Sequence, residues 1–75
     1  MEDNIIELKQ GEVLLHTNDE IKCLYLILSG ETDIYSRYGR ISTSAGSILG
    51  LSGSLYGLSL YNYVAKSDCI LRKFT

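Results

Sequence analysis

The sequence has little of what builds metal centres and disulfide frameworks. Its 75 residues include one histidine, His16, and two cysteines, Cys23 and Cys69. These three residues match no zinc-ligand spacing, and a metal-binding β-roll needs several histidines. Two cysteines also do not make the disulfide framework of a small secreted domain. We therefore predict no metal, no cofactor, and two free, buried thiols in a reducing cytoplasm.

Clustered basic charge is also missing. The formal net charge is −2 at neutral pH, and only Arg37 with Arg40 and Arg72 with Lys73 come close to pairing along the chain. Nucleic-acid binding requires basic side chains that gather on one face or element. The N-terminus is acidic and has no basic region leading into an apolar run, so we do not expect a signal peptide there. We predict no direct binding of nucleic acid by this chain.

The segment between Arg40 and Lys66 carries no charged side chain at neutral pH and is long enough to span a membrane. Serines, a threonine and an asparagine recur along it and would place too many polar groups in hydrocarbon. Its glycines are also too frequent for a stable helix. The run is therefore not predicted to be a membrane segment.

No set of residues converges on catalysis. Cys23 opens an apolar stretch and has no neighbouring base, so a buried thiol is expected rather than a nucleophile. The acidic pairs Asp19–Glu20 and Glu31–Asp33 fall at predicted turns or strand ends, where solvated carboxylates are normal. We predict that the chain is not an enzyme.

What the sequence does contain is alternation of β-forming residues, with glycines between the segments and no proline or long helical period. Strands are predicted over 4–8, 12–16, 22–29, 32–36, 40–44, 60–66 and 69–74. Within 22–29, leucines alternate with Tyr25 and Ile27, so we expect both faces of that strand to be covered. Ile34 is expected to point inward. The pattern predicts one all-β domain, a small sandwich or roll, with at most a turn of helix near 51–56.

The order of residues from Gly11 to Tyr35, GEVLLHTNDEIKCLYLILSGETDIY, resembles the opening of the cyclic nucleotide-binding domain family. That family has a Gly-Glu pair, a short strand, a Gly-Asp turn, and a strand ending in ILSG before E-x-x-x-Y. Asn18 replaces the glycine of the turn, and asparagine tolerates the left-handed conformation needed there. The later AGSILG, residues 45–50, is similar to the start of the family's phosphate cassette. The resemblance extends to about Phe74 and implies a jelly-roll-like, double-stranded β-roll with a one-turn helix in its cassette.

The resemblance also implies where a ligand would bind. In the family, a glutamate after the cassette glycine holds the ribose hydroxyl, and an arginine about eight positions later pairs with the cyclic phosphate. Here Leu51 follows Gly50, and the arginine position falls near Ser59. Only arginine offers a rigid bidentate fork, so serine cannot replace it. The backbone N–H groups of residues 52–55 could still attract an anion weakly.

Three hypotheses stay open for this loop: it binds a cyclic nucleotide, it binds a changed and neutral ligand, or it is a tight structural connection. For a neutral ligand, Leu51, Leu58 and Tyr61 would line an apolar pocket that has a few polar contacts. The candidate ligand-binding residues are Gly50, Leu51, Ser52, Gly53, Ser54, Ser59, Tyr61 and Asn62.

The combined prediction is a non-enzymatic regulatory or interaction module, 1–75, with lost or altered nucleotide binding. The alternative is the ligand-sensing effector domain of a transcriptional regulator, binding a cyclic nucleotide or another small molecule. The family's C-terminal helices have no counterpart in the sequence, so a fragment of a longer regulator and a reduced roll both stay open. The small core and uncharged tyrosine-bearing run predict a homo-oligomer, with Tyr56, Tyr61 or Tyr63 near the contact.

Overall fold

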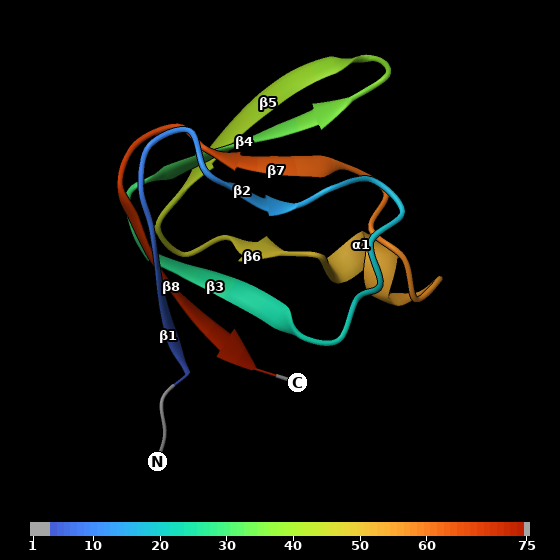
Figure 1. Ribbon diagram of the computed structural model, residues 1–75, viewed down its shortest axis with the longest axis horizontal. Helices are drawn as coiled ribbons and strands as arrows, with labels where there is room; N and C mark the ends of the chain where they lie inside the picture. Colours follow the sequence, from blue (N-terminus) through green and yellow to red (C-terminus); the bar gives the residue numbers. More distant parts are fainter. Residues whose placement is uncertain (1–3, 75) are drawn as a thin grey trace.

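The computed structural model describes residues 4–74, which form two antiparallel four-stranded sheets and one turn of helix (Figure 1). The predicted all-β roll with little helix is confirmed. Within these residues, no helix is long and apolar enough to cross a membrane. The elements are β1 Ile5–Leu8, β2 Val13–Leu15, β3 Leu24–Ser29, β4 Glu31–Ser36, β5 Gly39–Ser44, β6 Ile48–Leu49, α1 Leu51–Ser54, β7 Asn62–Ala65 and β8 Cys69–Phe74.

Each sheet combines strands from both halves of the chain. One sheet has the order β1-β8-β3-β6 and the other has the order β2-β7-β4-β5. In the first sheet, Leu71 of β8 lies opposite Ile27 of β3. In the second, Ile34 of β4 lies opposite Tyr63 of β7. These long-range pairings close the roll, with β6 leading into α1 and β7 beginning near it (Figure 1).

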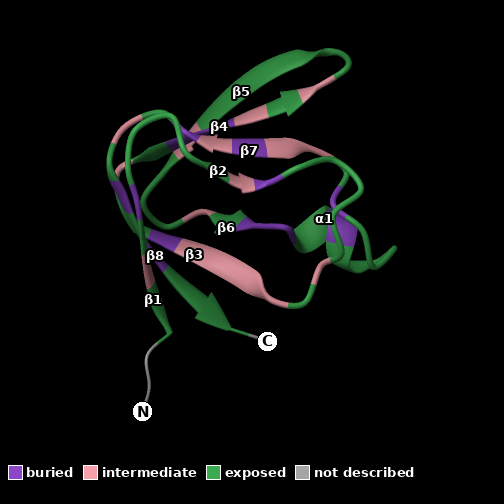
Figure 2. Ribbon diagram, viewed as in Figure 1, coloured by how far each residue is buried: buried purple, intermediate pink, exposed green. Residues whose placement is uncertain are grey.

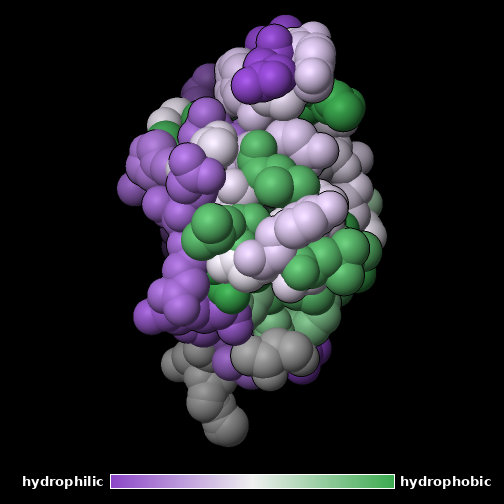
Figure 3. Space-filling model, turned by 90° about the vertical axis from the view of Figure 1, so that its right-hand side faces the viewer, coloured by the Kyte–Doolittle hydropathy of each residue, from purple (hydrophilic) through white to green (hydrophobic). Residues whose placement is uncertain are grey.

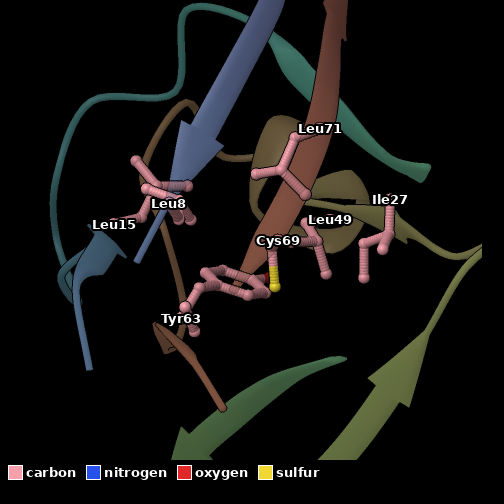
Figure 4. Close-up of a cluster of buried hydrophobic side chains, with 8 residues drawn as sticks. Leu8, Leu15, Ile27, Leu49, Tyr63, Cys69 and Leu71 are labelled. Atoms are coloured by element: carbon pink, nitrogen blue, oxygen red, sulfur yellow. The ribbon is translucent and has the colours of Figure 1, made fainter. Parts of the chain in front are cut away.

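The hydrophobic core lies between the two sheets and draws side chains from both (Figures 2 and 4). The period of two along a strand places Leu71 in the core while its neighbour Ile70 is exposed. Tyr63 brings an aromatic ring into the core from the second sheet. The buried apolar residues are Leu8, Leu15, Ile27, Leu49, Tyr63, Ala65, Cys69 and Leu71.

One acidic residue is buried against expectation. Asp33 was expected to be a solvated carboxylate, but it is only 6% exposed because β4 lies between β5 and β7. The hydroxyl of Ser42 on β5 donates to its Oδ1 at 2.6 Å. The guanidinium of Arg40 lies 4.0 Å from Oδ2. These partners offset the cost of burying the charge, which an unpaired carboxylate would not tolerate.

Three other local expectations were wrong. Both faces of β3 were expected to be covered, but Leu28 is 44% exposed because a sheet of this roll packs on one face only. Cys23 precedes β3 and is half-buried, whereas Cys69 is buried as expected. The segment Ile48–Leu49 lies outside the predicted strands, but it forms β6 by pairing with β3. Ile34 does pack against the core, as the alternation indicated.

Candidate functional site

The turn of helix α1 begins directly after Gly50, whose φ of 91° lies in the left-handed region. Glycine adopts this conformation without the strain that a side chain would add. The amide of Ser54 then donates to the carbonyl of Gly50 at 3.0 Å, and the Ser54 hydroxyl donates to the carbonyl of Leu51 at 2.6 Å. The sequence therefore located this turn correctly, within 51–56.

Gly53 is buried because α1 packs directly on the backbone of the segment that follows it. A Cβ on Gly53 would lie 2.6 Å from the Leu58 carbonyl oxygen and 3.2 Å from the Ser59 Cα. No side chain fits between these two backbones without a shift. Gly53 therefore serves the packing of α1 and does not line a ligand pocket.

Ser59 is also part of the framework. It is 1% exposed, and its hydroxyl donates to the carbonyl of Tyr61 at 2.7 Å. Its amide donates to the carbonyl of Asp19 at 2.8 Å, and its carbonyl accepts from the amide of Asn18 at 2.7 Å. These bonds fasten the segment after α1 to the loop between β2 and β3. Ser59 therefore presents no free group to a ligand.

Asn62 has a similar structural use. Its Oδ1 accepts a hydrogen bond from the backbone N–H of Thr17 at 2.8 Å, which joins the start of β7 to the loop after β2. Of the eight candidate ligand-binding residues, Gly53, Ser59 and Asn62 thus hold the local fold together.

The other five candidates come together around one open pocket of about 510 Å³, which we call the α1 groove. They are Gly50, Leu51, Ser52, Ser54 and Tyr61. The groove is completed by four residues that the sequence did not indicate as site residues. These come from β4, β6, β7 and the end of α1, namely Ile34, Ile48, Tyr63 and Leu55.

Two tyrosines of the groove pack edge to face. The ring centroids of Tyr61 and Tyr63 are 6.2 Å apart, with an interplanar angle of 84°, a favourable aromatic arrangement. Burial raises the pKa of Tyr63, and a hydrogen bond with the backbone of Gly50 opposes that rise. Tyr63 therefore connects the core of the second sheet with the start of α1. Tyr61 is half-buried and borders the groove itself.

The α1 groove has no charged lining among the described residues. Leu51 is the first residue of α1 and is 55% exposed. It occupies the position where the resemblance implies a glutamate. Figure 3 views the molecule from the side of α1 and shows hydrophobic surface over this region, below a hydrophilic tip of the β4–β5 hairpin. The groove can therefore hold an apolar body, with hydroxyls as its polar contacts.

The histidine and cysteines lie in separate settings. His16 has its Nδ1 3.6 Å from Asp19 Oδ2. The buried Cys69 thiol donates to the carbonyl of Glu31 at 3.0 Å. Within residues 4–74, no three histidine, cysteine or acidic side chains are grouped as they would be to hold a metal ion.

Several solved structures share this architecture. A regulatory subunit of a cAMP-independent protein kinase A from Trypanosoma brucei matches with a TM-score of 0.84 and 21% identity, over 93% of this chain and 27% of its own. The catabolite activator protein of Thermus thermophilus matches with a TM-score of 0.82 and 22% identity, over 93% of this chain and 36% of its own.

The N-terminal domain of a transcriptional regulator from Streptomyces coelicolor A3(2) matches with a TM-score of 0.79 and 22% identity, over 93% of this chain and 54% of that one. At these identities the likeness is one of fold, and this chain spans roughly a quarter to a half of each protein's length.

The sequence itself was compared with curated proteins and with models of protein families. It matches none of the curated proteins at a significant level. The family model described as the cyclic nucleotide-binding domain matches residues 5–75, which is nearly the whole chain. The chain therefore belongs to the cyclic nucleotide-binding domain family.

Proposed function

We propose that this chain is a regulatory or interaction module of its family in which cyclic nucleotide binding is lost or altered. The observation that carries the proposal is the uncharged lining of the α1 groove. Leu51 occupies the position implied for the ribose-binding glutamate, and the buried Ser59 occupies the position implied for the phosphate-binding arginine. A cyclic phosphate in this groove would lack its bidentate partner.

The energetic consequence is large compared with the affinity of a small ligand. Each of the two missing contacts is a hydrogen bond to a charged group, worth about 1.5–3 kcal/mol. A ribose hydroxyl against Leu51 would also lose its bonds to water without gaining an acceptor. A ligand with an apolar body and fewer polar groups fits the groove better than a cyclic nucleotide does.

The similar structures support a regulatory role. One belongs to the regulatory subunit of a kinase described as cAMP-independent, so the fold occurs in a protein with that property. The likeness to the N-terminal domain of a transcriptional regulator favours our second candidate, a ligand-sensing effector domain. Neither candidate makes this chain an enzyme.

Three further expectations remain proposals. We propose a homo-oligomer with Tyr56 or Tyr61 near the contact. Tyr56 is 72% exposed and Tyr61 is half-buried, whereas Tyr63 is only 3% exposed and is too buried to reach a partner. The free thiols of Cys23 and Cys69 favour a reducing compartment such as the cytoplasm. The dispersed basic residues favour no direct contact with nucleic acid. The boundary 1–75 of a single domain also stays a prediction.

The proposal is tested by restoring the two missing groups. The double variant Leu51→Glu with Ser59→Arg is titrated with cyclic AMP by calorimetry, beside both single variants and the wild-type chain. Because Ser59 is 1% exposed, melting temperature is recorded with and without nucleotide, so that a destabilised variant rescued by ligand is recognised. We expect binding by the double variant alone.

The matched control is Leu55→Glu with Ser59→Arg. It adds the same two charges but places the carboxylate at the end of α1 and not at its first residue. It should not bind. A folded Leu51→Glu, Ser59→Arg variant that fails to bind would contradict a cassette with two missing parts and would favour a structural turn.

A further inference from the structure

A second pocket lies beside the α1 groove, at the tip of the β4–β5 hairpin. We call it the hairpin pocket; it has a volume of about 570 Å³. Unlike the α1 groove, it contains a cation. Its lining residues are Thr17, Ser36, Arg37, Tyr38, Leu60 and Tyr61. Tyr61 therefore borders both the apolar groove and the pocket that contains Arg37.

Strand β4 joins the two pockets along one face. Ile34 lines the α1 groove and Ser36 lines the hairpin pocket. Residues two apart in a strand point to the same face and lie about 7 Å apart along it. That distance is similar to the length of a bicyclic aromatic ring system. One small molecule can therefore contact both pockets across Tyr61.

Arg37 has its hydrogen-bonding capacity available. Four other cations of the described chain lie within 4.0 Å of carboxylates, namely Lys9, Lys22, Arg40 and Lys66. Arg37 has no carboxylate within that distance among residues 4–74. Its guanidinium instead lies 5.9 Å from the centre of the Tyr38 ring, and the Tyr38 amide donates to the Ser36 hydroxyl at 3.1 Å. The hairpin turn thus supports a guanidinium whose donors have no carboxylate partner within residues 4–74 and can bind an anion.

We propose that the α1 groove and the hairpin pocket form one site for an amphiphilic anion. The apolar or aromatic body lies between Leu51 and Tyr61, and a single carboxylate or sulfonate group reaches Arg37. This proposal rests on the proposed function only in taking the α1 groove as the ligand site. It places the positive charge on the hairpin, in the pocket that shares Tyr61 with the α1 groove.

The test uses a pair of fluorescent probes that differ in charge. The anion is 8-anilino-1-naphthalenesulfonate, and the neutral probe is N-phenyl-1-naphthylamine, which has the same rings without the sulfonate. We expect the wild-type chain to bind the anion more tightly, in a salt-dependent manner. Arg37→Gln should weaken the anion about fivefold, as expected for one exposed charge contact, and leave the neutral probe unchanged.

The control variant is Arg40→Gln, which removes the same charge from the same hairpin but from a guanidinium near Asp33. It should leave both probes unchanged. Leu51→Ser should weaken both probes by the same factor, since it removes apolar contact without changing charge. Both Arg37 and Leu51 are exposed, so these variants should melt at the wild-type temperature.

Each contrary outcome has a definite meaning. The shared site is overturned if neither probe binds, if Arg37→Gln leaves the anion unchanged, or if Arg40→Gln weakens it equally. Displacement of the sulfonate probe by micromolar cyclic AMP would instead contradict the proposed loss of nucleotide binding, and the Arg37 result would still stand.

Discussion

Replacing Gly53 by alanine should destabilise the protein, although helix propensity alone predicts the opposite. Alanine is favoured over glycine by up to about 1 kcal/mol in a helix interior, and by less in a single turn such as α1. The added Cβ, however, would lie 2.6 Å from the Leu58 carbonyl oxygen, where ordinary contact begins at 3.4 Å. The helix would have to retreat by several tenths of an ångström.

The neighbouring structure resists that retreat. Ser59 is joined to Asn18 and Asp19 by backbone hydrogen bonds of 2.7 and 2.8 Å, so its segment cannot move away freely. Overpacking of this kind costs about 1–3 kcal/mol. After the gain in propensity, we expect Gly53→Ala to lower the free energy of unfolding by about 1–2 kcal/mol.

Urea unfolding followed by circular dichroism measures this change as a shift of the midpoint at constant slope. Ser52→Ala is the matched control, because Ser52 is exposed in the same turn of helix. Ser52→Ala should raise the free energy of unfolding by no more than about 0.5 kcal/mol. If Gly53→Ala is as stable as Ser52→Ala, the close approach of α1 to Leu58 is refuted.

Other predictions concern the rest of the roll. Gly30→Ala should cost about 3 kcal/mol in urea unfolding, because φ is +90° and the Cβ would overlap the Asp68 carbonyl oxygen and lie 2.9 Å from the Cys69 Cα; an unchanged midpoint would contradict this. Burial and a hydrogen bond with Cys23 raise the pKa of Tyr25 from 10.0 to about 12. The neutral Tyr25 hydroxyl therefore contributes to the free energy of unfolding fully below pH 10, and this contribution is lost as pH rises through about 12. In the Tyr25→Phe variant, this decrease in the free energy of unfolding should be absent. Analytical ultracentrifugation should show that the chain is an oligomer, and sedimentation as a monomer at high micromolar concentration would contradict the proposed oligomer.

The sequence was informative about the fold because local signals and tertiary pairing agree. Alternating residues placed Ile27 and Leu71 in strands, and glycines such as Gly30 marked where strands end. The errors came from pairing across the sheets. Asp33 is covered because β5 and β7 flank it, and a single sequence does not reveal that two strands become its neighbours.

The candidate site was predictable only in part, for the same reason. The cassette resemblance indicated Gly50 and Leu51, which do line the α1 groove. It also indicated Ser59, but polarity does not show that this hydroxyl is already bonded to the Tyr61 carbonyl. Arg37 was one of several scattered cations in the sequence. Only the fold shows that it lies in the turn after β4, three residues beyond the groove-lining Ile34, where it lines the hairpin pocket.

Calorimetric titration of the wild-type chain with cyclic AMP and cyclic GMP tests the central claim most directly. The missing partners at Leu51 and Ser59 should together weaken a micromolar site by about two to four powers of ten, at about 1.4 kcal/mol per decade. The account therefore predicts dissociation constants from about 0.1 mM upward, or no measurable heat. A dissociation constant in the low micromolar range for either nucleotide would contradict it.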